Sequence, residues 1–254
     1  MNEDIIISVE KSIIKRENTI IRPVSEYSKH IHDYLKYLEQ QSFPAPKAIS
    51  INENEEIVSY VDGNVRSQGL WDNESLIEVA KLVRNLHDIS ENYIPVDNAK
   101  FKPWYLSDIG DEKRIVSHGD IIPGNIIFST DNKTMTLIDW EFAGFVSSLT
   151  EFARVCMFFA QLYDDDIAIK RNLPPFNERT KIVRLMADVY GLTQEERLKL
   201  TDRIVEIAII ESAQEAIWNN ITENSVGELW DQACLARRAA KIYCNRDILK
   251  KALK

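Results

Sequence analysis

Two short stretches of the sequence combine residue types that can carry out phosphoryl transfer. The first contains His118 and Asp120, with Asn125 five residues after the aspartate, and the second ends an apolar run with Asp139. Phosphoryl transfer needs a carboxylate that orients an attacking hydroxyl and accepts its proton, and it needs hard oxygen ligands that hold magnesium against nucleotide phosphates. Asp120, Asn125 and Asp139 supply this set. Each residue type is also common in ordinary turns, so the prediction depends on the complete motif.

The spacing of these residues predicts that they meet. The turn Pro123-Gly124 can fold the amide of Asn125 back toward Asp120. The hairpin that follows returns Asp139 to the same edge. We therefore expect one cluster of oxygen-bearing side chains, built from two neighbouring bends of the chain.

The elements before these motifs follow the order strands, helix, strands. Short runs rich in Ile and Val predict two or three antiparallel strands in residues 4–24 and two more strands at residues 47–51 and 56–61. Between them, apolar residues recur at helical spacing from Glu26 to Gln41, and Ser25 is the expected N-cap.

After Gly63 the pattern becomes mainly helical. We expect a helix at residues 75–88 and helices after Leu149, with Pro174-Pro175 separating the first of these from the rest. Short apolar segments lie between, at residues 115–117, 125–128 and 135–138. This order predicts an α+β fold, with a small strand-rich part before a larger helical part.

The composition excludes several other classes of protein. The 254 residues carry 31 basic and 40 acidic side chains, a formal charge of −9, which disfavours a nucleic-acid surface and favours a cationic small molecule as ligand. The acidic start lacks a basic region, and no apolar stretch is long enough to cross a bilayer, so we expect neither a secretory signal nor a membrane segment. Three scattered cysteines suggest neither disulfides nor zinc, and the cytoplasm is the expected compartment.

The two motifs resemble those of the aminoglycoside phosphotransferase and choline kinase family, relatives of the protein kinases. HGDIIPGN followed by LIDWE carries the resemblance, which covers most of the chain, and weaker matches lie at residues 43–46, 57–63 and 82–87. The resemblance implies a two-lobed protein-kinase-like fold. A reduced N-terminal β-sheet lobe, residues 1–62, is expected to bind nucleotide, and a mainly helical C-terminal lobe, residues 63–254, is expected to carry out catalysis and bind the acceptor.

The resemblance also implies a reaction and assigns roles. We expect an ATP- and magnesium-dependent kinase that transfers the γ-phosphoryl group to a hydroxyl of a small molecule, such as an aminoglycoside, choline or a sugar, with GTP open as the nucleotide. The implied roles are a catalytic base at Asp120, magnesium ligands at Asn125 and Asp139, a brace of the catalytic loop at His118, adenine contacts by the backbone of Ser59, Tyr60 and Val61, and a phosphate ligand at Arg22. A surface cation on an edge strand is an equally good interpretation of Arg22.

The sequence departs from the family pattern near its N-terminus. No glycine precedes Gly63, so the glycine-rich turn over the phosphates is absent or is replaced by a tight hairpin near residues 10–12. The helix position that usually offers a glutamate to the strand cation holds Ile31, and Glu26, one turn earlier, is the expected substitute. These departures keep a second hypothesis open, in which the chain is a non-catalytic pseudokinase that acts through a partner.

A predicted helix at residues 202–222 offers one candidate site for the acceptor. Glu211, Glu215 and Trp218 share one of its faces with an apolar stripe. Two carboxylates beside an indole can bind an amine through charge and cation–π contact. The same pattern is expected of solvated acids beside a core tryptophan, and we favour this second interpretation.

Overall fold

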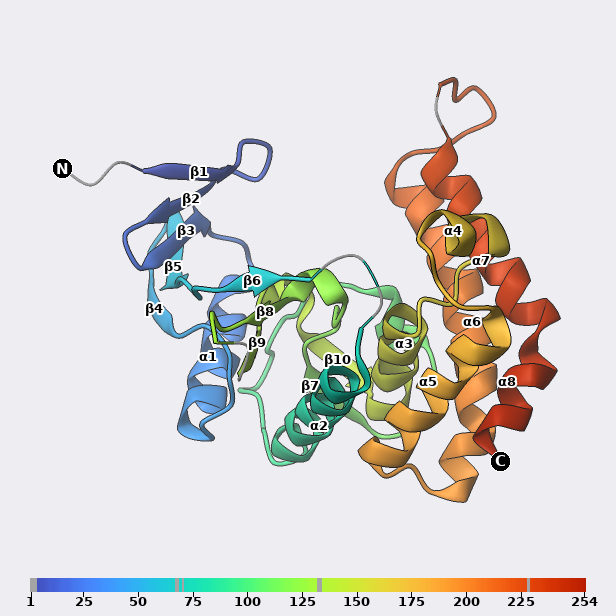
Figure 1. The fold of residues 1–254 in the computed structure, drawn as a ribbon. Helices are drawn as coiled ribbons and strands as arrows, with labels where there is room; N and C mark the ends of the chain where they lie inside the picture. Colours follow the sequence, from blue (N-terminus) through green and yellow to red (C-terminus); the bar gives the residue numbers. More distant parts are fainter. Residues whose placement is uncertain (1–3, 67–68, 70, 132–133, 228) are drawn as a thin grey trace. The chain divides into compact units, whose positions relative to one another are not determined.

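A computed structural model describes residues 4–66, 69, 71–131, 134–227 and 229–254, and Figure 1 shows the course of the chain. The first three residues of the acidic start lie outside the described part. The secondary structure follows the predicted order of strands, helix and strands, with a mainly helical remainder, which confirms the α+β class. Within the described residues, every helix is too short or too polar to span a bilayer.

The chain packs into two units, which we call unit 1 and unit 2. Unit 1 comprises residues 1–67, 86–103 and 115–145, and unit 2 comprises residues 68–85, 104–114 and 146–254. Helix α2 (Asn73–Ser90) contributes to both units. The predicted boundary between residues 62 and 63 divides the chain by nucleotide and acceptor binding, and it stays a prediction.

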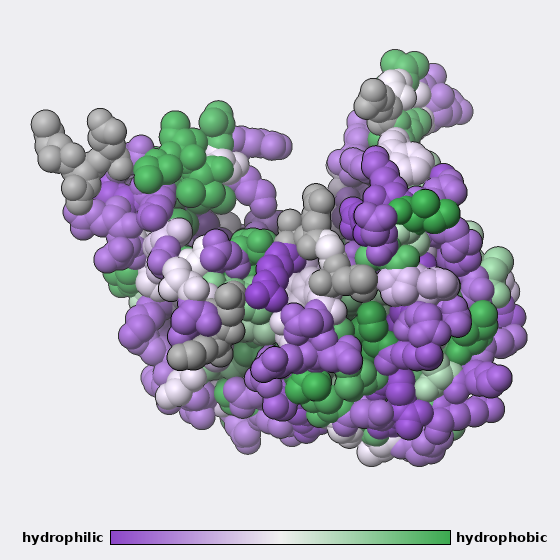
Figure 2. Space-filling model, viewed as in Figure 1, coloured by the Kyte–Doolittle hydropathy of each residue, from purple (hydrophilic) through white to green (hydrophobic). Residues whose placement is uncertain are grey.

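Unit 1 contains a five-stranded antiparallel sheet. Its strands, in spatial order, are β1 (Ile5–Ser8), β2 (Ile13–Arg16), β3 (Thr19–Pro23), β5 (Glu55–Ser59) and β4 (Ala48–Ile51). β3 and β5 pair inside the sheet and bury Ile21 and Val58. β1 lies at the edge and leaves its isoleucines exposed, as the apolar colour over this strand shows in Figure 2. The central strands therefore supply the core contacts of this sheet.

Helix α1 (Ser28–Gln40) packs in unit 1 through the predicted apolar face. The residues buried on that face are Ile31, Tyr34, Leu35 and Leu38. The prediction of the N-cap was wrong, because the helix is preceded by Tyr27 and not by Ser25. The backbone N–H of Ser25 donates to the hydroxyl of Ser28 at 2.9 Å. This local bond favours a turn over residues 25–28, so the helix begins later.

Two smaller sheets and two 3-10 turns contain the two motifs. One three-stranded antiparallel sheet has the order β6 (Asn64–Val65), β8 (Ile126–Phe128) and β9 (Met135–Leu137), and β7 (Arg114–Ser117) pairs with β10 (Gly144–Ser147). The 3-10 turns are η2 (Pro123–Asn125) and η3 (Trp140–Phe142). Both candidate motifs therefore lie on strand ends and tight turns. The sequence analysis did not predict strands β6 and β10.

Unit 2 is helical. Its elements are η1 (Tyr105–Asp108), α3 (Ser148–Phe159), α4 (Asp165–Lys170), α5 (Phe176–Tyr190), α6 (Gln194–Trp218), α7 (Trp230–Cys244) and α8 (Arg246–Leu253). Helix α6 packs against α3, α7 and α8 (Figure 1). It begins well before the predicted Asp202, because Thr193 and Glu196 form a capping box: each accepts a hydrogen bond from the other's backbone N–H.

Candidate functional site

The catalytic loop predicted from the first motif follows β7. The side-chain Nδ2 of Asn125 donates to Oδ2 of Asp120 and to the backbone carbonyl of Asp120, each at 2.9 Å. The amide therefore folds back to the carboxylate, as the spacing predicted. Because the amide nitrogen is engaged in these bonds, the amide oxygen is the atom that Asn125 can offer to a cation.

A single residue, Ile138, joins this loop to the second motif. Its backbone N–H donates to the carbonyl of Asn125 at 2.9 Å, and its carbonyl accepts from Nε2 of His118 at 2.8 Å. The other ring nitrogen of His118, Nδ1, accepts from the backbone N–H of Asp120 at 3.2 Å. His118 is fully buried, so its ring ties the two motifs together inside the protein.

Asp139 has a left-handed backbone conformation, with φ 62° and ψ 67°. Non-glycine residues adopt this region rarely and at an energetic cost, and such residues cluster at functional sites. Burial and the Glu141 carboxylate raise the pKa of Asp139 above its ordinary value, although Arg22 and Lys11 act in the opposite direction. A further cation near Asp139 would therefore stabilise the charged form of its carboxylate.

Trp140 connects the two motifs to helix α1. The buried indole lies 4.4 Å from the ring of His118 and 5.8 Å from the ring of Tyr34, centroid to centroid. Its Nε1–H donates to the carbonyl of Leu137 at 3.0 Å, and the hydroxyl of Tyr34 donates to the carbonyl of Val116 at 2.8 Å. Sequence reasoning gave Trp140 no role, although its position after Asp139 was a signal.

Arg22 is held by a carboxylate of the neighbouring strand. Arg22 and Glu56 are direct cross-strand partners in β3 and β5, and Nε of Arg22 donates to Oε1 of Glu56. Nε2 of His32, from α1, lies 3.2 Å from the second oxygen of Glu56. Nη1 of Arg22 lies 3.7 Å from Oδ1 of Asp139. Because β3 is an internal strand, the interpretation of Arg22 as a surface cation on an edge strand is wrong.

The environment of Glu56 stabilises its charge. Burial acts to raise the pKa of this carboxyl, but the close approach of His32 and the charge of Arg22 outweigh burial and hold the pKa of Glu56 below its usual value. Glu56 is therefore a buried anion with a specific cationic partner.

The partner of the strand cation comes from the sheet and not from the helix. Glu26, the predicted substitute, instead lies 3.3 Å from the ammonium of Lys100. Sequence reasoning missed Glu56, because strand register decides which side chains face each other. An acid next to the apolar pair Ile57-Val58 was the signal that could have found it.

A cavity of about 360 Å³ within unit 1 is lined by several charged side chains. Its charged lining residues are Lys11, Arg22, Lys102, Glu56, Asp139 and Glu141. Asp120 and Asn125 are not among the residues that line it. One predicted metal ligand, Asp139, and the predicted phosphate ligand, Arg22, therefore line the same cavity.

Sequence reasoning assigned no ligand role to the two lysines of this cavity. Lys11 lies in the turn between β1 and β2, where the tight hairpin was predicted, and its Nζ lies 2.8 Å from Oε1 of Glu141. Nζ of Lys102 lies 3.8 Å from Oε2 of the same carboxylate. Both ammonium groups therefore share one acidic partner.

The predicted adenine-binding segment ends β5. The backbone N–H of Ser59 donates to the carbonyl of Lys47 at 2.9 Å, and that of Tyr60 donates to the carbonyl of Asn18 at 2.8 Å. These two donors are engaged within the sheet. For the predicted adenine contacts of Ser59, Tyr60 and Val61, this leaves the backbone N–H of Val61 as the donor and the carbonyl groups of the segment as acceptors.

The predicted acceptor-binding residues lie on α6 in unit 2. Oε1 of Glu211 accepts from the hydroxyl of Tyr105 at 2.9 Å and from Nη2 of Arg154 at 3.2 Å, and Oε2 accepts from Arg238. Glu211 is 3% exposed. We call Tyr105, Arg154, Glu211 and Arg238 the Glu211 network. Its geometry favours a structural role for Glu211 over contact with an acceptor.

The other two residues of that helix face are more accessible. The ring of Trp218 stacks on the ring of Trp104 with centroids 4.8 Å apart, and Trp218 is partly exposed. Glu215 is half-buried, and its backbone carbonyl accepts from Asn219 at 2.8 Å. Their role in acceptor binding stays a prediction.

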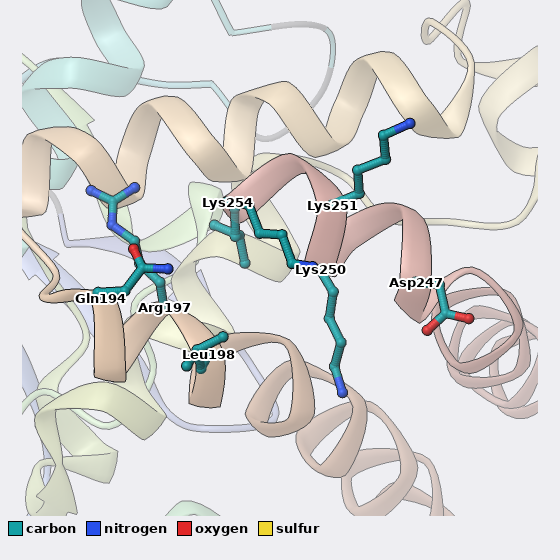
Figure 3. Close-up of a pocket in the computed structure, with 8 residues that line it drawn as sticks. Gln194, Arg197, Leu198, Asp247, Lys250, Lys251 and Lys254 are labelled. Atoms are coloured by element: carbon teal, nitrogen blue, oxygen red, sulfur yellow. The ribbon is translucent and has the colours of Figure 1, made fainter.

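A second cavity, of about 670 Å³, lies in unit 2 between the start of α6 and α8. Figure 3 shows Lys250 and Lys251 of α8 extending in different directions, and Arg197 of α6 lies to their left in this view. Lys250 pairs with Asp202, and Arg197 pairs with Asp188. The cavity contains no residue of the two motifs, so we do not assign the predicted chemistry to it.

The fold and the two motifs are those expected of kinase-like phosphotransferases, and comparisons with known proteins agree. The model of the phosphotransferase enzyme family matches residues 99–171, which include both motifs. The trifolitoxin immunity protein of Rhizobium leguminosarum bv. trifolii is 30% identical over 261 residues, covering 100% of both chains.

Solved structures show the same fold. Choline kinase from Cryptosporidium parvum aligns with a TM-score of 0.60 and 13% identity over 100% of this chain and 89% of that one. An aminoglycoside phosphotransferase from Streptomyces rimosus aligns with a TM-score of 0.52 and 14% identity over 80% of this chain and 88% of that one. Over its full length the chain belongs to the same family as the trifolitoxin immunity protein, and its residues 99–171 match the phosphotransferase enzyme family. Family and fold support a phosphotransferase that acts on a small molecule.

We predict that Glu56→Gln lowers the free energy of unfolding by about 3–5 kcal/mol, because it leaves the guanidinium of Arg22 without its buried anionic partner. Urea unfolding at pH 7 measures the change. Glu53→Gln, at an exposed turn position, is the control and is expected to stay within about 0.5 kcal/mol of the unchanged protein. An equally small effect for Glu56→Gln would show that the pair contributes little.

The stability difference between the unchanged protein and Glu56→Gln is also expected to depend on pH. The pKa of Glu56 is lower in the folded chain than its ordinary value of 4.5, so its contribution is complete above that value and is lost as the pH falls below it. Unfolding curves from pH 7 to pH 3 test this. A difference that stays constant over this range would contradict it.

A third prediction concerns Gly119, which has a φ of +79° and approaches Phe142 so closely that a Cβ would lie 2.2 Å from its carbonyl oxygen. Gly191 has a similar φ of +84° and open space around it. Gly191→Ala is expected to cost about 1 kcal/mol from the backbone alone. Gly119→Ala is expected to cost about 1–3 kcal/mol more, because of the clash. Equal costs in urea unfolding would mean that the loop moves away freely.

Proposed function

We propose that the chain is an ATP- and magnesium-dependent kinase that transfers the γ-phosphoryl group to a hydroxyl of a small molecule. The observation that carries this proposal is the bonding around Ile138, which links Asp120 and Asn125 to the residue before Asp139. This is the donor set that phosphoryl transfer requires. Membership of the family supports the same reaction class.

The residues present fit a magnesium ion that is held together with nucleotide phosphates. Among the described residues, no group of three or more His, Cys, Asp or Glu side chains is arranged to hold a metal. Magnesium differs from zinc in needing few protein ligands, since it usually takes one or two carboxylates and keeps water and phosphate oxygens. Asp139, with its raised pKa, and the amide oxygen of Asn125 would hold it.

Each residue then has a defined task. Asp120 orients the acceptor hydroxyl and accepts its proton, and Asn125 keeps that carboxylate in place through its Nδ2. Arg22, fixed by Glu56, holds phosphate oxygens by charge. Magnesium, when bound, neutralises charge on the phosphates. His118 keeps the catalytic loop and Asp139 in register and does not act as a base.

We predict that Asp120→Asn lowers kcat by about 10²–10⁴-fold, because the amide cannot accept the proton. The dissociation constant for ATP with magnesium is expected to change little. Asp97→Asn, an exposed carboxylate of unit 1, is the matched control. The assay measures ATP consumption with a panel of aminoglycosides, choline, sugars and amino-alcohols. Consumption that is equal for the unchanged protein and Asp120→Asn on every acceptor would favour the pseudokinase hypothesis.

A second candidate function is protection of a cell against a toxin. It rests on one observation, the identity to a protein named for immunity to trifolitoxin over the full length of both chains. The two functions combine where the acceptor hydroxyl belongs to the toxin. Expression of the chain in trifolitoxin-sensitive cells tests this. Protection that Asp120→Asn abolishes favours phosphoryl transfer, protection that it leaves intact favours binding, and no protection overturns this candidate.

A further inference from the structure

The turn between β1 and β2 has no glycine and carries a lysine into the charged cavity. Backbone N–H groups of glycine-rich turns bind phosphates by close approach, and residues 9–12 read Val-Glu-Lys-Ser. Ser12 takes the positive φ of the turn, 51°. The backbone N–H of Ser12 donates to the carbonyl of Val9 at 3.2 Å, and that of Lys11 donates to Oγ of Ser8 at 3.1 Å. These two amides are therefore engaged inside the turn.

The side chain of Lys11 does reach the cavity. Its ammonium lies 2.8 Å from Glu141, and the charge of Asp139 also acts on it. Arg22 is the other cation close to Asp139, at 3.7 Å, but its Nε is committed to the buried Glu56. Of these two cations, both of which act on Asp139, Lys11 is therefore the one that can change partner with little rearrangement.

The pairing of Lys11 with Glu141 is weak enough to be exchanged. The Lys11 side chain is 55% exposed and that of Glu141 is 28% exposed, and exposed ion pairs contribute little to stability. A polyphosphate offers several oxygens with more negative charge than one carboxylate, so an ammonium bonds to it more strongly. Lys102 is a second cation near Glu141, with its Nζ 3.8 Å from Oε2. It can neutralise that carboxylate once Lys11 has left.

We propose that Lys11 is a phosphate ligand that takes the place of the missing glycine-rich turn, binding the β- and γ-phosphates of the nucleotide, and that Glu141 holds Lys11 while the cavity is empty. This inference rests on the proposed function for the presence of a nucleotide. It assigns a binding role to a residue outside the two motifs.

The test is a binding measurement that needs no turnover. Isothermal titration calorimetry gives dissociation constants for ATP, ADP, AMP and adenosine, each with magnesium, on the full chain. Lys11→Ala is expected to weaken ATP and ADP binding by about 10- to 100-fold, since it removes a charge-assisted bond. It is expected to change adenosine binding less than about twofold, since adenosine has no phosphate, and Lys11→Arg is expected to recover most of the lost affinity.

Lys36→Ala is the matched control, because Lys36 is an exposed lysine of α1 and its removal changes the net charge equally. It is expected to leave all four constants within about twofold. Lys11→Ala that binds ATP as tightly as the unchanged protein does would overturn the role of Lys11 and leave the proposed function standing. An unchanged protein that binds no nucleotide would overturn both. An equal loss for adenosine and ATP would show a fold defect and also overturn the role.

A double-mutant measurement tests the part played by Glu141. With ATP and without magnesium, Glu141→Gln is expected to tighten binding, because it frees Lys11 from a competing anion. In the Lys11→Ala background, the same substitution is expected to increase the affinity for ATP by a smaller factor. Equal gains in both backgrounds would show that Glu141 acts only by general charge repulsion, which overturns its role as the holding partner.

Discussion

The candidate site depends on the backbone of one residue, Ile138. Both backbone polar groups of Ile138 bond to the catalytic loop, the N–H to the carbonyl of Asn125 and the carbonyl to the ring of His118. Ile138 is half-buried, and breaking the hydrogen bond of a backbone group that is shielded from water costs free energy. The two bonds fix the end of β9 against the loop and hold the next residue, Asp139, in a backbone conformation that it would rarely adopt alone. The spacing of Asp139 from Asp120 is therefore set by backbone bonds and by the packed ring of Trp140.

The parts of the site that sequence could predict are those that depend on local spacing. Asp120 and Asn125 are five residues apart, and the turn between them suffices to bring the amide to the carboxylate. Glu56 could not be found in this way, because its contact with Arg22 depends on the register of β3 against β5. The fold shows the same division. Long periodic helices and Ile-rich strands were predictable, whereas the start of α1 depended on the bond between Ser25 and Ser28. The spacing of Thr193 and Glu196 does predict the early start of α6, although the sequence analysis placed this start later.

At the proposed nucleotide end of the site, side-chain charges of the sheet and its β1–β2 turn stand where the family pattern has backbone dipoles and a helix carboxylate. Glu56 is the direct cross-strand partner of Arg22 and accepts from its Nε, so the pairing of β3 with β5 restricts the position of the guanidinium. An ammonium on the β1–β2 turn is less rigid, since a lysine stem loses rotamer freedom when it binds. A full charge compensates in part, because it attracts phosphate over a longer distance than an amide does. The replacement preserves attraction for a polyphosphate and reduces the precision with which it is held.

At the proposed acceptor end, the most buried of the predicted acids, Glu211, is already paired with cationic side chains. Glu211 accepts bonds from Tyr105, Arg154 and Arg238, so one carboxylate faces two guanidinium groups. Burial raises the pKa of Tyr105, and the hydroxyl stays a donor to Glu211. The Glu211 network carries a net positive charge and repels an incoming amine at this depth. Its contacts instead tie α6 to η1, α3 and α7. Any attraction for a cationic acceptor on this face of α6 must therefore come from the more accessible Glu215 and Trp218, where charge and an aromatic ring lie near solvent.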